Sequence, residues 1–193
     1  MKKSTMILLG VVVILAIWAI SSYNGMVKED EQVGKAWGNV QSAYQRRADL
    51  IPNLVNVVKG YAEHEKGTLE GVIEARAKAT QININVEDLT EENMQKLNAA
   101  QGELSSALNK LMAVAEAYPD LKANENFMEL QSQLEGTENR INEVRNKYNE
   151  TVQSYNVKVR KFPGNLVAGI FGFSTKPMFQ ADESAQKAPE VKF

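Results

Sequence analysis

The sequence contains no cysteine among its 193 residues. This absence excludes disulfide bonds, thiolate metal sites and cysteine nucleophiles. Histidine is nearly as scarce, because His64, between Glu63 and Glu65, is the only one. A helical metal site needs ligands that share one face, such as two histidines four residues apart. We therefore interpret His64 as a solvent-exposed side chain on or near the second helix.

A strong charge of either sign is also lacking. The chain carries 22 basic and 24 acidic side chains, a formal net charge of −2. This balance is not basic enough to attract nucleic acid, so we predict no nucleic-acid partner. The sequence has no Walker-type phosphate loop and no plausible Ser-His-Asp set. We predict no enzyme, no cofactor, no metal and no small-molecule substrate.

Charged side chains are missing altogether from residues 4–27. Within this stretch, residues 6–23 are mostly apolar, and they include Trp18 and Tyr23, residue types that favour membrane interfaces. A bilayer core requires ~20 mostly apolar residues in a helix. We predict a transmembrane anchor over residues 1–23. A cleaved signal peptide is the alternative, but the bulky Trp18 occupies a position where cleavage needs a small residue.

Basic residues flanking the apolar run predict its orientation. Lys2 and Lys3 precede the run, whereas Lys28 follows it together with three acidic residues. Because basic flanks favour the cytoplasmic side, we expect the N-terminus in the cytoplasm and the bulk of the chain outside it. The expected location is the inner (cytoplasmic) membrane, crossed once.

No proline interrupts the segment from Ala123 to Phe162. Apolar or near-apolar residues recur there mostly at alternating steps of three and four. This spacing predicts a long helix with a continuous apolar face, which partner helices must cover. The predicted face consists of Phe127, Leu130, Leu134, Thr137, Ile141, Val144, Tyr148, Val152, Tyr155, Val159 and Phe162.

The preceding sequence supplies candidate partner helices. An apolar pattern from residue 33 to 51 predicts a first helix, and Pro52 disfavours helical geometry at the residue before it. With Asp49 as a possible cap, we predict a turn here and a second helix that fades near residue 80. A third helix is expected to begin at its cap, Thr90, and to stop at Pro119.

These segments predict an all-α fold, an antiparallel up-and-down bundle over residues 24–162 with four helices favoured. Division near Asp49 gives segments that stack with tolerable overhang. A purely intermolecular coiled coil is the alternative. The short connections at Pro52 and Pro119 argue against it.

The chain changes character after Pro163. Residues 163–179 are apolar, contain glycine and are too short to span a bilayer, whereas residues 180–193 are polar and interpreted as a disordered tail. Four antiparallel helices would bring the apolar segment back to the anchor, to lie on the bilayer or to plug the base of the bundle. A mere kink at Pro52 would instead leave three helices and carry Phe171 to the far end.

Five charged residues near the predicted apolar faces are candidates for a structural polar network. Buried charges must be paired, and such pairs could fix the register of the helices. The alternative is that the long side chains reach water. The candidates are Arg47, Arg76, Glu116, Glu138 and Arg140.

Five motifs are spread along most of the chain in a specific order and spacing. They are YNGMV at 23–27, RRADLIPNLVNVVKGYAEHE at 46–65, EAR at 74–76, EAYPDLKANENFMELQSQLEGTENRINEVRNKYNETVQSYN at 116–156 and FP at 162–163. Together these motifs resemble the LemA family. The resemblance implies a single N-terminal membrane helix and a helical body, and it implies neither catalytic residues nor an established activity. It also implies a short N-terminus outside the cell, opposite to the expectation from Lys2 and Lys3.

Three classes of function follow from these features. The favoured hypothesis is a membrane-tethered interaction or scaffold module of the bacterial cell envelope, whose partner is an unknown envelope protein. One alternative is a metal-binding or enzymatic carboxylate site in the bundle. The other is a lipid-surface protein that acts through residues 164–173.

Overall fold

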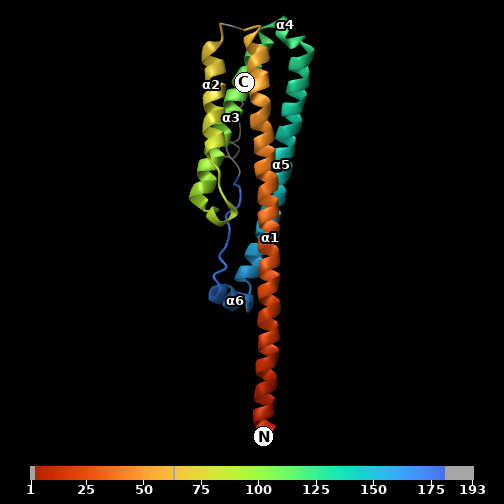
Figure 1. Cartoon of the computed structure of the whole chain (residues 1–193), viewed down its shortest axis with the longest axis vertical. Coiled ribbons are helices and arrows are strands. Elements are labelled where there is room, and N and C mark those ends of the chain that lie inside the picture. Colours follow the sequence, from red (N-terminus) through yellow and green to blue (C-terminus); the bar gives the residue numbers. More distant parts are fainter. Residues whose placement is uncertain (1–2, 63, 181–193) are drawn as a thin grey trace, which may run out of the picture.

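The computed structural model describes residues 3–62 and 64–180 (Figure 1). This part of the chain is helical and contains no β-strand. Its elements are α1 (Lys3–Lys59), α2 (Lys66–Gln81), the 3₁₀ turn η1 (Val86–Asp88), α3 (Glu91–Glu116), α4 (Pro119–Lys122), α5 (Glu125–Arg160) and α6 (Gly164–Phe171).

Four of these helices form an antiparallel bundle, which confirms the predicted fold class. In Figure 1, α1 rises from the N-terminus, α2 returns beside it, α3 rises again and α5 descends along α1. The lower part of α1 extends well beyond the bundle as a bare helix (Figure 1). At 1.5 Å per residue, α1 is ~85 Å long.

The predicted turn between Asp49 and Pro52 is wrong. α1 continues through Pro52 to Lys59, and the chain reverses afterwards, before α2 begins. A proline inside a helix leaves the carbonyl four residues earlier without its usual donor. Here that carbonyl, of Ala48, accepts a hydrogen bond of 2.7 Å from Nε of Arg76 on α2. A neighbouring helix thus supplies the donor that Pro52 lacks.

The inference that a kink at Pro52 would leave only three helices is also wrong. α2 begins after the reversal and covers only part of the length of α1, so the count of four is kept without a turn at Pro52. The C-terminal segment therefore returns to the anchor, where the ring centroids of Tyr23 and Phe171 lie 4.8 Å apart.

Side chains cap the N-termini of α3 and α5. The Oγ1 of Thr90 accepts a hydrogen bond of 3.2 Å from the backbone N–H of Asn93, which confirms the predicted cap of α3. In the same way Oδ1 of Asn124 accepts from the N–H of Phe127 at 3.0 Å and starts α5. α3 ends at Glu116, ahead of Pro119, which opens the short α4.

The interior of the bundle forms two apolar clusters along its length. The membrane-proximal cluster includes Trp37 and Tyr148, and the distal cluster includes Leu54, Leu111 and Phe127. The predicted apolar face of α5 supplies residues to both, so that prediction is confirmed for all its members except Leu130 and Phe162. Of that face, Leu130 is half-buried, and Phe162, which lies beyond the end of α5, is 74% exposed.

After α6 the chain reverses and runs back up the bundle as an extended strap, residues 173–180 (Figure 1). The reversal uses Gly172, whose φ of 77° lies in the left-handed region that glycine tolerates best. Of the predicted disordered tail, 180–193, all but Gln180 lies outside the described residues. His64 is exposed, as predicted, and lies in the turn between α1 and α2, two residues before α2 begins.

Candidate functional site

The most distinctive surface of the chain is the bare N-terminal part of α1. Its large apolar side chains are exposed, for example Ile14 at 68% and Ile17 at 62%, whereas Met26 is fully buried in the bundle. Among the described helices, α1 alone is long and apolar enough to cross a membrane. The chain therefore has the form of a membrane anchor that continues without a linker into a helical bundle.

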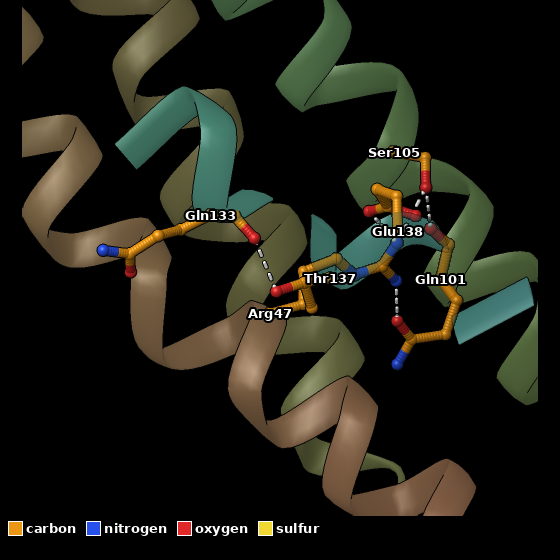
Figure 2. A network of polar contacts seen from close by, with 6 residues as sticks. All are labelled: Arg47, Gln101, Ser105, Gln133, Thr137 and Glu138. Atoms are coloured by element: carbon orange, nitrogen blue, oxygen red, sulfur yellow. Dashed lines mark hydrogen bonds and ion pairs between the residues drawn. The ribbon is translucent and has the colours of Figure 1, made fainter. Parts of the chain in front are cut away.

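Inside the bundle, a polar network surrounds Arg47, which is 2% exposed (Figure 2). Its Nη1 donates to Oε1 of Glu138 at 2.8 Å and to Oγ of Ser105 at 3.0 Å. Its Nη2 donates to Oε1 of Gln101. Because these partners come from α3 and α5, one guanidinium joins three helices at one level of the bundle.

The electrostatics of this network suit a structural clamp. Arg47 is buried, and a buried cation needs a counter-charge and hydrogen bonds to remain there. The side chain of Glu138 is 38% exposed. Its carboxylate therefore stays partly solvated by water while it neutralises the charge of Arg47. The guanidinium carbon of Arg47 also lies 5.5 Å from the centroid of the Tyr44 ring.

The structure brings together only some of the five residues considered for a polar network. Arg47 and Glu138 form its ion pair, and Arg76 binds the carbonyl of the residue that follows Arg47. Glu116 instead pairs with Lys122 near the distal end of the bundle. Arg140 pairs with Glu143 on the surface of α5.

Sequence reasoning missed Ser105 as a partner of Arg47. Its hydroxyl lies one helical turn after Gln101, and it also bonds the Gln101 carbonyl at 3.1 Å. The sequence feature that could have predicted this contact is the spacing of four residues, which places Ser105 on the same helix face as Gln101.

A cleft of about 210 Å³ lies beside this network. It is bordered by Trp37 and Gln41, both of which donate to the carbonyl of Ile84, at 2.8 and 3.1 Å. These bonds hold the connection before η1 against α1. The volume is below the ~300–1,000 Å³ typical of ligand pockets. Within residues 3–62 and 64–180, no group of three or more His, Asp and Glu side chains is placed to hold a metal ion.

Two asparagines of α5 fasten the strap to the bundle. Asn149 accepts from the N–H of Phe179 at 2.8 Å and donates to its carbonyl at 2.9 Å. Asn156, seven residues later on the same face, makes the same pair of bonds to Lys176, each of 2.9 Å. Each amide thereby satisfies both backbone groups of one extended residue, as a neighbouring β-strand would.

The fastened strap places Phe179 in an aromatic cluster. Its ring lies 6.1 Å from that of Trp37 and 5.3 Å from that of Tyr148, and Arg145 covers it at 4.6 Å. Phe179 is 7% exposed and belongs to the proximal core. The apolar segment predicted for residues 163–179 therefore contributes core as well as surface.

Two tyrosines under the strap stay neutral far above physiological pH. Burial raises the pKa of Tyr148, whose hydroxyl donates to the carbonyl of Pro177 at 3.0 Å. Burial, and then the charge of Asp30, raise the pKa of Tyr155 to about 12. Both rings therefore pack as neutral groups, and the hydroxyl of Tyr148 serves as a hydrogen-bond donor.

Fold and anchor together define a class: a membrane-associated bundle of long helices with one N-terminal span. The sequence profile of the LemA family matches residues 36–193, and the chain belongs to this family. The family is not known for an enzymatic activity.

Individual relatives are distant. The magnetosome proteins MamQ 1 and MamQ 2 of Paramagnetospirillum magneticum are each 26% identical over 175 residues, which cover 82% of this chain and 64% of each relative. Protein LemA of Metamycoplasma hominis is 25% identical over 160 residues, 83% of this chain and 69% of that protein. The chain thus spans less than two thirds of the length of the MamQ relatives.

Proposed function

We propose that this protein is a membrane-tethered scaffold whose helical bundle binds another protein of the cell envelope. The observation that carries the proposal is the continuity of α1, which is at once the membrane span and the longest helix of the bundle. A helix without a break transmits position and rotation from the bilayer to the bundle. Such a construction suits a module that presents a binding surface at a set height above the membrane.

The buried network supports this role. Arg47 ties α1 to α3 and α5, so the helix that enters the membrane is held in register with the rest of the bundle. Arg76 ties α2 to α1 one residue further along. A bundle held together in this way is a rigid platform, on which a partner is bound along a helix face or at the distal end.

We further propose that the span lies in the inner membrane and that the bundle faces away from the cytoplasm. The basic flank formed by Lys2 and Lys3 supports this orientation. The relatives named as magnetosome proteins are membrane-associated, which supports a membrane location for this chain as well.

Site-directed photocrosslinking in native membranes tests the scaffold role. A photoreactive residue at Tyr61 or Met128, both exposed near the distal end, samples the end of the bundle, and one at Lys110 samples its side. We expect a discrete crosslinked protein from one of these regions, competed by excess untagged chain. Crosslinks of equal yield from every position, to many proteins, would contradict a specific partner. Stoichiometric iron, manganese or zinc in the purified chain would instead favour the metal-dependent alternative.

A further inference from the structure

Exposed apolar side chains outside the span gather at the base of the bundle. Phe162, Leu166, Ile170 and Phe171 are 74, 56, 77 and 57% exposed. No charged residue occurs from Phe162 to Thr175. An exposed apolar patch of this kind marks a surface that contacts something other than water.

The helix that carries this patch, α6, is already fixed by its other face. Val167 and Ala168 are each 3% exposed and belong to the proximal core cluster. Leu166 and Ile170, four residues apart, share the outer face. The inner face therefore closes the base of the bundle, and the outer face is left for a different contact.

Both ends of α6 touch the same short stretch of α1. At its start, a Cβ on Gly164 would lie 3.2 Å from Cε of Met26 and 3.8 Å from Oγ of Ser22. At its end, the ring of Phe171 lies 4.8 Å from that of Tyr23. Residues 22 to 26 extend only ~6 Å along α1, whereas α6 is ~12 Å long. α6 therefore lies across α1, as Figure 1 shows, and parallel to the surface of a membrane that α1 crosses.

The height of α6 coincides with the end of the span. Residues 6–23 extend ~26 Å as a helix, close to the ~30 Å of a bilayer core, so Tyr23 lies at its boundary. Phe171 and Phe173 both contact Tyr23, at 4.8 and 5.6 Å between ring centroids. A bilayer that surrounds the span up to Tyr23 thus meets the outer face of α6.

Charge at the same level suits a lipid headgroup. Arg160 and Lys161 lie at the end of α5, separated from α6 by Phe162 and Pro163. Both are exposed, and neither forms an ion pair with any described residue. Lys28, about one turn above Tyr23 on α1, is exposed as well. Of the acidic residues that follow it, Glu29 and Asp30 pair with Lys158 and Lys176, and Glu31 is exposed. Cations next to an apolar helix face are the pattern of helices that lie in the headgroup region.

From these observations we infer that α6 is a second membrane contact, an interfacial helix that inserts Leu166, Ile170 and Phe171 into the leaflet on the bundle side. The bundle then rests on the bilayer beside its own anchor. Two contacts restrict the tilt of the bundle relative to the bilayer plane, which a single span leaves variable. The inference requires the span but neither the proposed partner nor the proposed orientation.

Fluorescence quenching of the full chain in phosphatidylcholine vesicles tests this contact. Since the chain has no cysteine, Ile170→Cys provides one site for a bimane label. Ile73→Cys on α2 is the matched control, an isoleucine that is 53% exposed far from the span. We expect nitroxide-bearing lipids to quench the label at position 170 strongly and the label at 73 not at all. Aqueous iodide is expected to show the opposite order.

Equal quenching by iodide at positions 170 and 73 would overturn the inference. So would a label at 170 that neither quencher reaches, since it would then be covered by protein, for example by a second copy of the chain. Leu166→Cys provides an independent site on the same face if Ile170→Cys alters the helical circular dichroism. Lipid quenching at either site, in a variant of native helicity, supports the contact.

Discussion

A single buried cation organises the middle of the bundle. The guanidinium of Arg47 has one charged partner, Glu138, and two neutral ones, Gln101 and Ser105. Loss of the charged partner leaves the arginine with neutral acceptors only. Breaking a buried pair in this way costs more than removing both members, because the remaining charge stays desolvated.

We therefore expect Glu138→Gln to lower the free energy of unfolding by about 1–3 kcal/mol. Glu143→Gln is the matched control, because it removes the same charge from the exposed pair with Arg140 and should cost under about 0.5 kcal/mol. Urea unfolding of the detergent-solubilised chain, followed by circular dichroism, measures both. Equal losses in the two variants would show that Arg47 does not depend on Glu138.

A second arginine contact, made by the half-buried Arg76, compensates for a covalent feature of the backbone. Pro52 has no N–H, and Arg76 donates to the carbonyl of Ala48 that this N–H would have reached. The role of Arg76 thus depends on the presence of proline. With alanine at position 52, the helix would satisfy the carbonyl by itself.

A double-mutant cycle separates this role from simple packing. We expect Arg76→Met to cost about 1–3 kcal/mol in the natural chain, because it leaves a buried carbonyl unsatisfied. In the Pro52→Ala background the same substitution should cost less than about 0.5 kcal/mol. The two unfolding free energies are measured as above. An identical cost in both backgrounds would mean that Arg76 contributes only through its contacts.

This pair of residues also shows why local reasoning failed at Pro52. The effect of a proline on its own helix is predictable from sequence, but the donor that offsets it lies 24 residues away and on another helix. The pairing of Arg47 with Glu138 was easier to predict from the sequence, since both residues lie beside predicted apolar faces. Glu116 and Arg140 also lie beside predicted apolar faces, but they pair with residues close to them in the sequence, Lys122 and Glu143.

At the level of elements, periodicity was the reliable signal. The apolar face of α5 could be predicted because steps of three and four fix which side chains share a face, whatever covers them. The position of the strap could not be predicted in this way, because an extended segment lacks the helical spacing of three and four. Its position depends on Asn149 and Asn156, which appear in the sequence as ordinary polar residues of a helix.

The α5 face gives a direct stability test. Leu134→Ala and Ile141→Ala should each cost ~2–5 kcal/mol, because both side chains are buried and their loss leaves cavities. Lys147→Ala, on the exposed side of the same helix, should cost under about 0.5 kcal/mol. Similar small losses at all three positions, in the same unfolding assay, would place the apolar face on the wrong side of α5.

Hydrogen exchange in the strap tests a more local interaction. Asn149→Ala removes both side-chain bonds to Phe179, so we expect hydrogen exchange at the Phe179 amide to accelerate by about tenfold or more. Asn146→Ala, an exposed asparagine one turn earlier, is the control and should leave that amide unchanged. Exchange read by mass spectrometry of C-terminal peptides measures the difference. Unchanged protection in Asn149→Ala would show that aromatic packing alone holds the strap.

The side of the membrane that the bundle occupies depends on the charges that flank the span. The flanking charges favour the N-terminus in the cytoplasm, whereas resemblance to the family implies the reverse. The fold adds basic residues at the base of the bundle, among them Arg160 and Lys161, yet these are distant in sequence from the span. The rule counts basic residues within ~15–20 residues of the span, and long domains cross membranes largely regardless of charge.

Lys2 and Lys3 therefore decide the expectation, and a pair of single cysteines tests it in living cells. Lys110→Cys places a thiol on the exposed side of α3, and Ser4→Cys places one at the other end of the span. With the bundle outside the cytoplasm, an impermeant maleimide should label Lys110→Cys in intact cells, after permeabilisation of an outer membrane where one exists. Ser4→Cys should react only once the inner membrane is broken. The reverse pattern would place the bundle in the cytoplasm and move the leaflet that α6 contacts to the cytoplasmic side, while leaving the contact itself unchanged.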